Sequence, residues 1–169
     1  NRNPGMSKEQ IETRLKDFLN IEHILWIGDG IEGDDTDGHI DDIARFVAPS
    51  TIVCAVESNK NDSNYGPLQV NFKMLKTMRD QDGNKLTVLP LPMPAPVLCE
   101  DQRLPASYAN FYIANKVVLL PVFDDPKDKE AVAVLRDCFP DREIVSIPAR
   151  DLVWGLGTCH CLSQQEPAL

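Results

Sequence analysis

The sequence of 169 residues contains no apolar run long enough to cross a membrane and no signal-peptide pattern. Positive charge is also scarce, with 17 Lys and Arg against 26 Asp and Glu and a formal net charge of −9. Proteins that bind nucleic acid present clustered Lys and Arg to the phosphates, so this balance argues against a nucleic-acid partner. It suits a cationic ligand better. We therefore expect a protein that binds neither nucleic acid nor a membrane.

The five cysteines lack the spacing of a disulfide framework, and their number is odd. Reduced thiols in a cytoplasmic protein are therefore expected. No two cysteines have the two to four intervening residues that structural zinc sites prefer. The run 159–161 (CHC) could form a zinc site with His39 and Asp41. This alternative is weaker, because in a strand His160 points away from both neighbouring thiols.

One stretch, residues 29–42, has seven acidic residues and no Lys or Arg. His39 lies inside it, two residues before Asp41. The surrounding carboxylates favour the imidazolium form of His39, which suits a proton donor to a leaving amine. If the chain is extended here, His39 and Asp41 point to the same side, since strand side chains alternate. A loop histidine beside a surface acid, without a catalytic role, is the structural alternative.

The same stretch does not match the calcium-binding loop of an EF-hand. That loop needs acidic residues at positions 1, 3 and 5, glycine at position 6 and glutamate at position 12. With Gly38 placed at position 6, Gly33 occupies position 1 and Ala44 position 12. The sequence therefore predicts no calcium site here, and it predicts no other metal ligands.

A second informative stretch, residues 157–165 (GTCHCLSQQ), lies near the C-terminus and carries Cys159 and Cys161. Two buried thiols in a closing core strand are one interpretation. Gly155 and Gly157, which permit an unusual backbone, and the polar residues that follow Cys161 argue against it. A thiol nucleophile, a histidine acid/base and carboxylates that bind a cation are together the groups needed to attack a guanidinium carbon.

The predicted elements indicate an α/β protein in which one module occurs twice. Ser7 and Gln10 form a capping box for a helix over residues 8–18, which is followed by a predicted strand at 23–27. The first copy of the module comprises strands near 40–47 and 51–56, a helix near 67–79 and a strand at 86–91. The second comprises strands near 109–113 and 117–122, a helix near 127–138 and a strand at 143–147. A repeated ββαβ unit favours blades around a centre over a doubly wound sheet.

Four segments resemble the agmatine deiminase family, which is grouped with the Porphyromonas-type peptidylarginine deiminases in the pentein superfamily. They are residues 1–5 (NRNPG), 33–47 (GDDTDGHIDDIARFV), 107–113 (SYANFYI) and 160–168 (HCLSQQEPA). The resemblance implies the pentein α/β fold, in which five ββαβ blades close into a propeller around a central site. Such enzymes are about twice as long, so residues 1–169 would form the C-terminal part of one catalytic domain, with roughly two to three blades. The N-terminal part would be absent.

The resemblance also implies roles for individual residues. Cys161 matches the nucleophile that forms an amidino-cysteine intermediate, His39 matches the acid/base, and Asp41 matches the carboxylate that follows it. Asp35 and Asp37 lie in the same loop and would help to hold the substrate. The bound cation itself favours the thiolate, and this chemistry needs no metal or organic cofactor.

The resemblance predicts an agmatine deiminase, which converts agmatine and water to N-carbamoylputrescine and ammonia. Deiminases of peptidylarginine or free arginine are alternatives, because the groups that bind the far end of the substrate would lie partly in the absent half. A non-catalytic half-propeller that acts as a binding module is an alternative from another class. The 169 residues alone are expected to be inactive and to self-associate, since open strand edges would remain. The sequence leaves open whether the parent protein forms a homo-oligomer.

Overall fold

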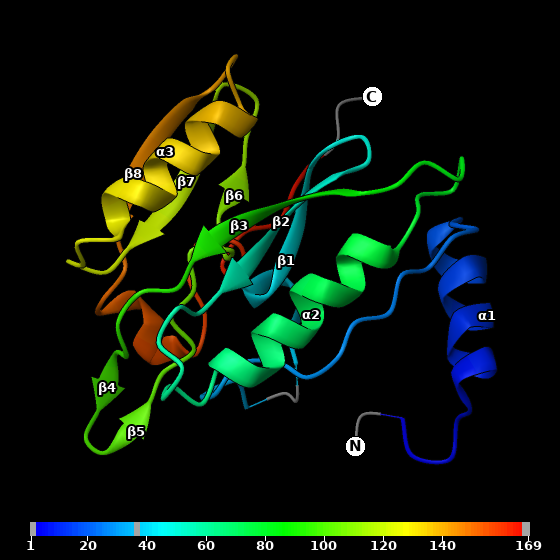
Figure 1. The fold of residues 1–169 in the computed structure, drawn as a ribbon, viewed down its shortest axis with the longest axis horizontal. Helices are drawn as coiled ribbons and strands as arrows, with labels where there is room; N and C mark the ends of the chain where they lie inside the picture. The colour runs from blue at the N-terminus through cyan, green and yellow to red at the C-terminus, as the bar shows by residue number, and fades with distance from the viewer. Residues whose placement is uncertain (1–2, 36–37, 167–169) are drawn as a thin grey trace.

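The computed structural model describes residues 3–35 and 38–166, and its fold is built from two ββαβ units (Figure 1). The first unit consists of β1 (Ala44–Ala48), β2 (Thr51–Val56), α2 (Tyr65–Thr77) and β3 (Thr87–Pro92). The second consists of β6 (Tyr112–Ile113), β7 (Val117–Val122), α3 (Asp128–Cys138) and β8 (Glu143–Pro148). The α/β class and the repeated module that the sequence predicts are therefore confirmed.

Both units have the same sheet topology. In the first, β2 pairs with β1 in antiparallel and with β3 in parallel orientation. In the second, β7 pairs with β6 in antiparallel and with β8 in parallel orientation. The helix of each unit forms the crossover that a parallel pair requires. The registers also correspond, because Thr51 pairs with Thr87 at the start of one parallel pair and Val117 with Glu143 at the start of the other.

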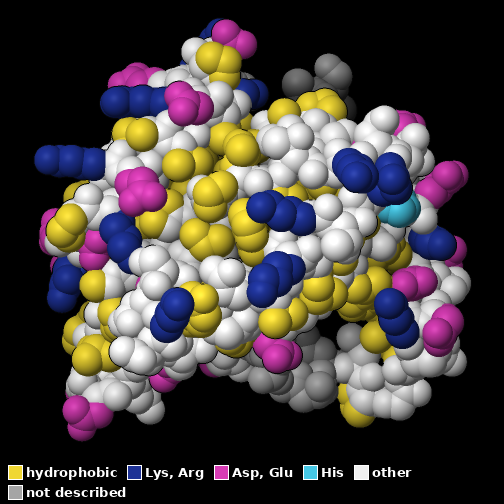
Figure 2. All heavy atoms as spheres, viewed as in Figure 1, with side chains coloured by type: hydrophobic (Ala, Val, Ile, Leu, Met, Phe, Trp, Pro, Cys, Tyr) yellow, Lys and Arg dark blue, Asp and Glu magenta, His cyan; other side chains and the backbone are white. Residues whose placement is uncertain are grey.

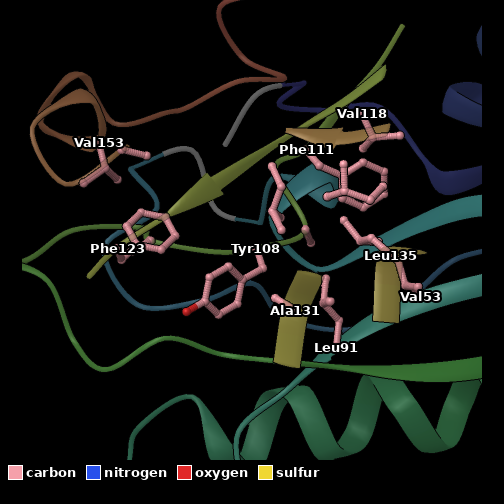
Figure 3. Close-up of a cluster of buried hydrophobic side chains, with 14 of the residues drawn as sticks. Val53, Leu91, Tyr108, Phe111, Val118, Phe123, Ala131, Leu135 and Val153 are labelled. Carbon is pink, nitrogen blue, oxygen red and sulfur yellow. The ribbon is translucent and has the colours of Figure 1, made fainter. Parts of the chain in front are cut away.

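The two units share one hydrophobic core, in which side chains from both sheets and from α3 converge (Figure 3). Its members include Val53, Leu91, Val118, Ala131 and Leu135. All five side chains are inaccessible to solvent. Burial of a Val or Leu side chain contributes roughly 1.5–3 kcal/mol, so this cluster holds the units in a defined relative position.

A second cluster of buried side chains lies between α2 and the first sheet. Leu68 and Leu75, which share one face of α2, belong to it together with Ile52 and Cys54 of β2. Val53, between these two residues of β2, belongs to the core that joins the units. Because strand side chains alternate, β2 is buried on both faces, which explains the continuous apolar run of this strand.

The helix α1 (Lys8–Leu19) confirms the helix predicted near the N-terminus and its capping box. The Ser7 hydroxyl accepts a hydrogen bond from the Gln10 N–H, and the Ser7 N–H donates to Gln10 Oε1 at 2.8 Å. No residue of α1 is buried, and the helix lies at the edge of the molecule (Figure 1). Its formation thus rests on local capping more than on packing.

The predicted strand at 23–27 is wrong, because this segment pairs with no strand. Side chains hold it instead. Trp26 Nε1 donates to Glu12 Oε1 of α1 at 2.7 Å, and His23 Nε2 lies 2.9 Å from the Arg79 carbonyl oxygen. The apolar side chains of Leu25 and Ile27 pack against the cluster between α2 and the first sheet, and the segment forms no backbone ladder.

Two further predicted strands begin later than expected. The chain at Ile40–Asp42 forms a 3₁₀ turn (η1), so β1 starts at Ala44. A turn at residues 108–109 likewise delays the start of β6 to Tyr112. In both units a turn therefore replaces the first part of the predicted strand.

The remaining elements lie between and after the two units. A hairpin of β4 (Leu98–Cys99) and β5 (Gln102–Arg103) occupies the connection between the units, and a 3₁₀ turn (η2, Leu152–Gly155) follows β8. Of the helices formed by residues 3–35 and 38–166, none is long and apolar enough to cross a membrane. Figure 2 shows basic side chains scattered among apolar and acidic ones on the face that α2 and α3 present.

Candidate active site

Three segments that are far apart in the sequence meet beside the first strands of the two units. Asp41 lies in η1, directly before β1; Asn110 lies just before β6; and Cys161 lies in a C-terminal turn, residues 158–163. Hydrogen bonds between their side chains join all three segments. The sequence singled out Cys161 and Asp41, and the structure places Cys161 Sγ 3.3 Å from Asp41 Oδ2.

Cys161 lies in a turn, so the interpretation of this segment as a closing core strand is wrong. The turn is closed by a hydrogen bond of 3.1 Å from the Leu162 N–H to the Thr158 carbonyl oxygen. A Cβ atom added to Gly157 would lie 2.6 Å from Cys161 Cβ and 2.9 Å from Sγ, so only glycine fits there. Cys161 is exposed, whereas Cys159 is buried. The thiol of Cys161 is therefore the one that a substrate can reach.

The surroundings of Cys161 keep its thiol protonated in the free protein. Partial burial of the sulfur raises the pKa of Cys161, the hydrogen bond from Asn110 opposes this, and the charges of the nearby aspartates raise the pKa further. Asn110 Nδ2 lies 3.2 Å from Sγ. A bound cation is the change that would lower this pKa, because it favours the thiolate.

Asp41 is the carboxylate that faces the thiol. Its Oδ2 accepts hydrogen bonds from His160 Nδ1 at 2.6 Å, Asn110 Nδ2 at 3.0 Å and Cys161 Sγ at 3.3 Å. Burial raises the pKa of Asp41, but the hydrogen bonds from His160 and Cys161 outweigh it and hold the pKa below its usual value. Asp41 is therefore ionised at neutral pH and able to bind a cation.

The pKa of Asp42, the next residue, is shifted in the opposite direction. It is only 2% exposed, and its Oδ1 accepts a hydrogen bond from Asn110 Nδ2 at 3.0 Å. Burial, followed by the charge of Asp41, raises the pKa of Asp42 to about 7. Two neighbouring carboxyl groups thus differ in charge at slightly acidic pH, one ionised and facing the thiol, the other protonated and buried.

Asp42 predicts a pH dependence of stability. Because its pKa is about 7 in the folded chain against an ordinary 3.8, the folded state holds one more proton than the unfolded state between these values. The free energy of unfolding is therefore expected to fall as the pH rises through this window, by up to about 1.4 kcal/mol per pH unit. Asp42→Asn should remove that slope, since asparagine stays neutral and keeps an acceptor for Asn110.

Urea unfolding at about pH 4.5, 5.5 and 6.5 measures this slope for each variant. Asp151→Asn is the matched control, because the same change is made at an exposed residue away from the site. It should keep the wild-type slope. The same slope in Asp42→Asn and the wild type would contradict a raised pKa of Asp42.

Asn110 is a site residue that the sequence reasoning missed, although the segment 107–113 was noted for its resemblance. It is 1% exposed, and its Oδ1 accepts from the Thr158 N–H at 3.2 Å, the Thr158 hydroxyl at 2.8 Å and the His160 N–H at 3.1 Å. Its Nδ2 donates to the two carboxyl groups and the thiol described above. The signal that could have identified it is a single amide inside a run of buried apolar residues.

The described contacts of His39 are with Asp34, whereas those of Asp41 are with His160, Asn110 and Cys161. The chain enters η1 directly after His39, so the extended geometry that would place both side chains on one side is not formed. His39 Nδ1 lies 3.5 Å from Asp34 Oδ1, and the His39 N–H donates to Asp34 Oδ2 at 2.5 Å. Asp35 is exposed, and Asp37 lies outside the described residues.

Among the described residues, one group places three potential metal-ligand atoms within 4.8 Å of one another, namely those of Asp34, His39 and Asp42. Asp34 and Asp42 already accept hydrogen bonds from protein N–H groups. Cys159 and Cys161 do not belong to this group, so the zinc site considered from the sequence gains no support from the geometry. We assign no metal or cofactor ligand.

The family of the chain follows from a comparison of its sequence with known families. The model of the Porphyromonas-type peptidyl-arginine deiminase family matches residues 1–167. The chain belongs to this family. Curated relatives include the agmatine deiminases of Pseudomonas putida strain KT2440 and Pseudomonas aeruginosa strain LESB58, which are 40% and 38% identical over 186 residues. Each comparison covers 99% of this chain and 50% of the relative, so the chain spans about half the length of the curated relatives it matches.

Solved structures of agmatine deiminases have the same fold. The enzyme of Enterococcus faecalis matches with a TM-score of 0.92 and 35% identity, over 98% of this chain and 50% of that one. A substrate-bound agmatine deiminase of C. jejuni matches with a TM-score of 0.85 and 34% identity, over 94% and 46%. The resemblance predicted from the sequence motifs is confirmed, and the two ββαβ units are part of the pentein-type α/β fold of this family.

Proposed function

We propose that the protein is an agmatine deiminase, which hydrolyses agmatine to N-carbamoylputrescine and ammonia. The observation that carries this proposal is the contact between an exposed thiol and a carboxylate, Cys161 Sγ and Asp41 Oδ2, in a member of this family. The relatives named as agmatine deiminases favour agmatine as the substrate. Because the chain spans about half their length, the proposal concerns the full-length protein.

The acidic side of the site would bind the cationic substrate. A carboxylate such as Asp41 accepts two parallel N–H groups of a guanidinium through charge-assisted hydrogen bonds, which also orient the planar group. The guanidinium carbon would then lie next to Cys161 Sγ. We assign to Asp35 and Asp37, in the acidic loop before η1, a role in holding the rest of agmatine, whose far end carries a second positive charge.

In the first half of the reaction, Cys161 attacks the guanidinium carbon. The bound cation offsets the carboxylates that raise the thiol pKa, so the thiolate forms when substrate is present. An S–C bond forms, His39 donates a proton to the departing nitrogen, and ammonia leaves. An amidino-cysteine on Cys161 remains.

In the second half, His39 takes a proton from water, and the resulting hydroxide adds to the same carbon. The C=O bond forms as the C–S bond breaks, the hydroxyl proton passes to solvent, the thiolate of Cys161 is restored, and N-carbamoylputrescine leaves. The positive charge of the substrate cancels the charge of the attacking thiolate or hydroxide, so no oxyanion develops and no oxyanion hole is needed. Cys161, His39 and the carboxylates perform every step, and the mechanism calls for no metal or organic cofactor.

The remaining half of the protein would complete the site. We propose that further ββαβ blades close a five-bladed propeller and supply additional carboxylates to the guanidinium. Two features support this. The strands β1 and β6 are edge strands of their sheets. In addition, Ile40 of η1 and Phe46 of β1 are each 54% exposed. The 169 residues alone are therefore expected to be inactive, and we expect the full-length protein to act in the cytoplasm.

The substrate is tested by ammonia release from agmatine, free arginine and an arginine-containing peptide, with the full-length protein and the 169-residue chain side by side. We expect kcat/KM for agmatine to exceed that for the other two by about 100-fold. The isolated chain should release no ammonia. A preference for the peptide, the candidate that the family description favours, would replace agmatine as the substrate. No ammonia from any of the three would refute a deiminase.

A non-catalytic binding module is the competing interpretation, and thiol labelling separates it from an enzyme. A haloacetamidine, which carries a cationic amidine, should label Cys161 selectively over the other four cysteines. Uniform slow labelling of all accessible thiols would support the non-catalytic module. Peptide mapping by mass spectrometry identifies the labelled residue.

A further inference from the structure

The oxygen of Asp41 that faces the thiol is fully occupied before any substrate arrives. A carboxylate oxygen has two lone pairs, yet Asp41 Oδ2 accepts three hydrogen bonds. The shortest, at 2.6 Å, comes from His160 Nδ1. A guanidinium that binds both oxygens of Asp41 must therefore displace one of the three donors.

Two of the three donors cannot leave without disrupting the site. Asn110 is buried and holds the turn of Cys161 through its Oδ1, and Cys161 carries the reacting sulfur. The ring of His160 is different, because its side chain is 40% exposed. The His160 N–H is anchored separately, at 3.0 Å from the Asn110 carbonyl oxygen. Rotation of the side chain alone can thus move the ring into solvent while the backbone of the turn stays in place.

We propose that the His160 ring occupies Asp41 Oδ2 in the free enzyme and that the cationic substrate binds Asp41 by displacing this ring. This inference rests on the proposed function, in which Asp41 binds the guanidinium. An amidinium or guanidinium replaces the lost hydrogen bond with charge-assisted bonds of its own. A neutral donor replaces the hydrogen bond without bringing a positive charge to the carboxylate, so His160 covers Asp41 more effectively against neutral ligands than against cations.

The competing role for His160 is that of a support, which orients Asp41 and remains in contact with it while substrate is bound. The two roles predict opposite effects of removing the ring. Without a competing donor, a cation should bind Asp41 more readily. Without a support, Asp41 should bind the cation less well.

Alkylation of Cys161 by 2-chloroacetamidine and by 2-chloroacetamide distinguishes the two roles. Both reagents have the same chemistry, in which the thiolate forms an S–C bond and chloride leaves, but only the amidine is cationic. The ratio of their second-order rate constants therefore measures recognition of the cation, because changes in thiol reactivity or in folding affect both rates alike. The full-length protein is used, and intact mass with peptide mapping confirms Cys161 as the modified residue.

We expect His160→Ala, which removes the donor to Asp41, to raise this ratio about five- to tenfold over the wild type. His160→Asn, whose Nδ2 can take the place of the ring Nδ1 and still donate an uncharged hydrogen bond, should give a smaller rise, and it provides the measurement if the first variant does not fold. His23→Ala is the matched control, because the His23 ring contacts the Arg79 carbonyl oxygen and not Asp41. It should keep the wild-type ratio.

An unchanged or lower ratio in both His160 variants would overturn the displacement proposal. Asp41→Asn separates that failure from a failure of the proposed function. If Asp41→Asn leaves the wild-type ratio unchanged, Asp41 does not bind the cation and its assigned role in the reaction is wrong. If Asp41→Asn lowers the ratio while the His160 variants do not raise it, Asp41 binds the cation and only the displacement of His160 is refuted.

Discussion

Replacement of Cys161 by serine is expected to reduce agmatine turnover by the full-length protein about 10⁴-fold or more. The neighbours of Sγ are Asp41 and Asn110, and neither is a base strong enough to ionise a serine hydroxyl. The thiol, in contrast, becomes a thiolate when a cation is bound beside it. Steady-state ammonia release from agmatine measures the effect.

Cys138→Ser is the matched control for this prediction, because it makes the same chemical change at a half-buried position of α3. It should keep turnover within about twofold. If Cys161→Ser retains more than about a tenth of the wild-type rate, a difference of only 1.4 kcal/mol in the barrier, Cys161 is not the nucleophile. If Cys159→Ser loses turnover while Cys161→Ser remains active, the nucleophile is the buried Cys159.

Replacement of Asn110 by alanine is expected to lower the free energy of unfolding by about 2–4 kcal/mol and turnover about 10³-fold. The substitution removes the acceptor of the Thr158 N–H and hydroxyl groups and the donor to Asp42, all in a buried setting, whereas the His160 N–H keeps the backbone carbonyl oxygen of residue 110. Buried polar groups without a partner account for the loss of stability. The loss of turnover follows because the turn of Cys161 is no longer held beside Asp41. Urea unfolding and ammonia release measure the two effects.

Asn71→Ala is the matched control, since Asn71 is equally buried and its amide also forms hydrogen bonds, from the Gly28 N–H at 2.7 Å and to the Asp29 carbonyl oxygen at 2.8 Å. A comparable loss of stability is expected. The rate at which neutral iodoacetamide alkylates Cys161 should change in Asn110→Ala and stay at the wild-type value in Asn71→Ala. An equal alkylation rate in both variants would show that Asn110 has a purely structural role.

The position of the site depends on the packing that joins the two units. η1 leads directly into β1, and Asn110 lies just before β6, so the relative position of the two sheets sets the distance between their side chains. Val53 and Leu91 of the first unit are buried with Val118 of the second in one core. Cavities in this core should therefore impair the site without touching it, because the hydrogen bonds of Asn110 span both units.

The local sequence determined the elements that depend on residues only a few positions apart. The capping box of Ser7 and Gln10 begins α1, and the spacing of Ala131 and Leu135 gives α3 its buried face. The repeat of the ββαβ module was visible for the same reason, since each strand and helix has its own apolar period. The motifs around His39 and Cys161 were also local, and they sufficed to predict the family.

The tertiary structure overrode local propensity in four places. The apolar run at 23–27 favoured a strand, but the segment pairs with no strand and its side chains contact other elements. The turns before β1 and β6 replaced the first residues of two predicted strands. In the C-terminal segment, the close approach of Gly157 to Cys161 produced a turn where a strand was considered.

Only the tertiary structure decided which groups act on Asp41. His160 and Asn110 lie 119 and 69 positions from it in the sequence, and no local rule relates residues so far apart. The same holds for Asp41 and Asp42, which are identical and adjacent yet have pKa values shifted in opposite directions. Such shifts are sums of burial, charges and hydrogen bonds over all residues that the fold brings near, so they arise only once the chain has folded.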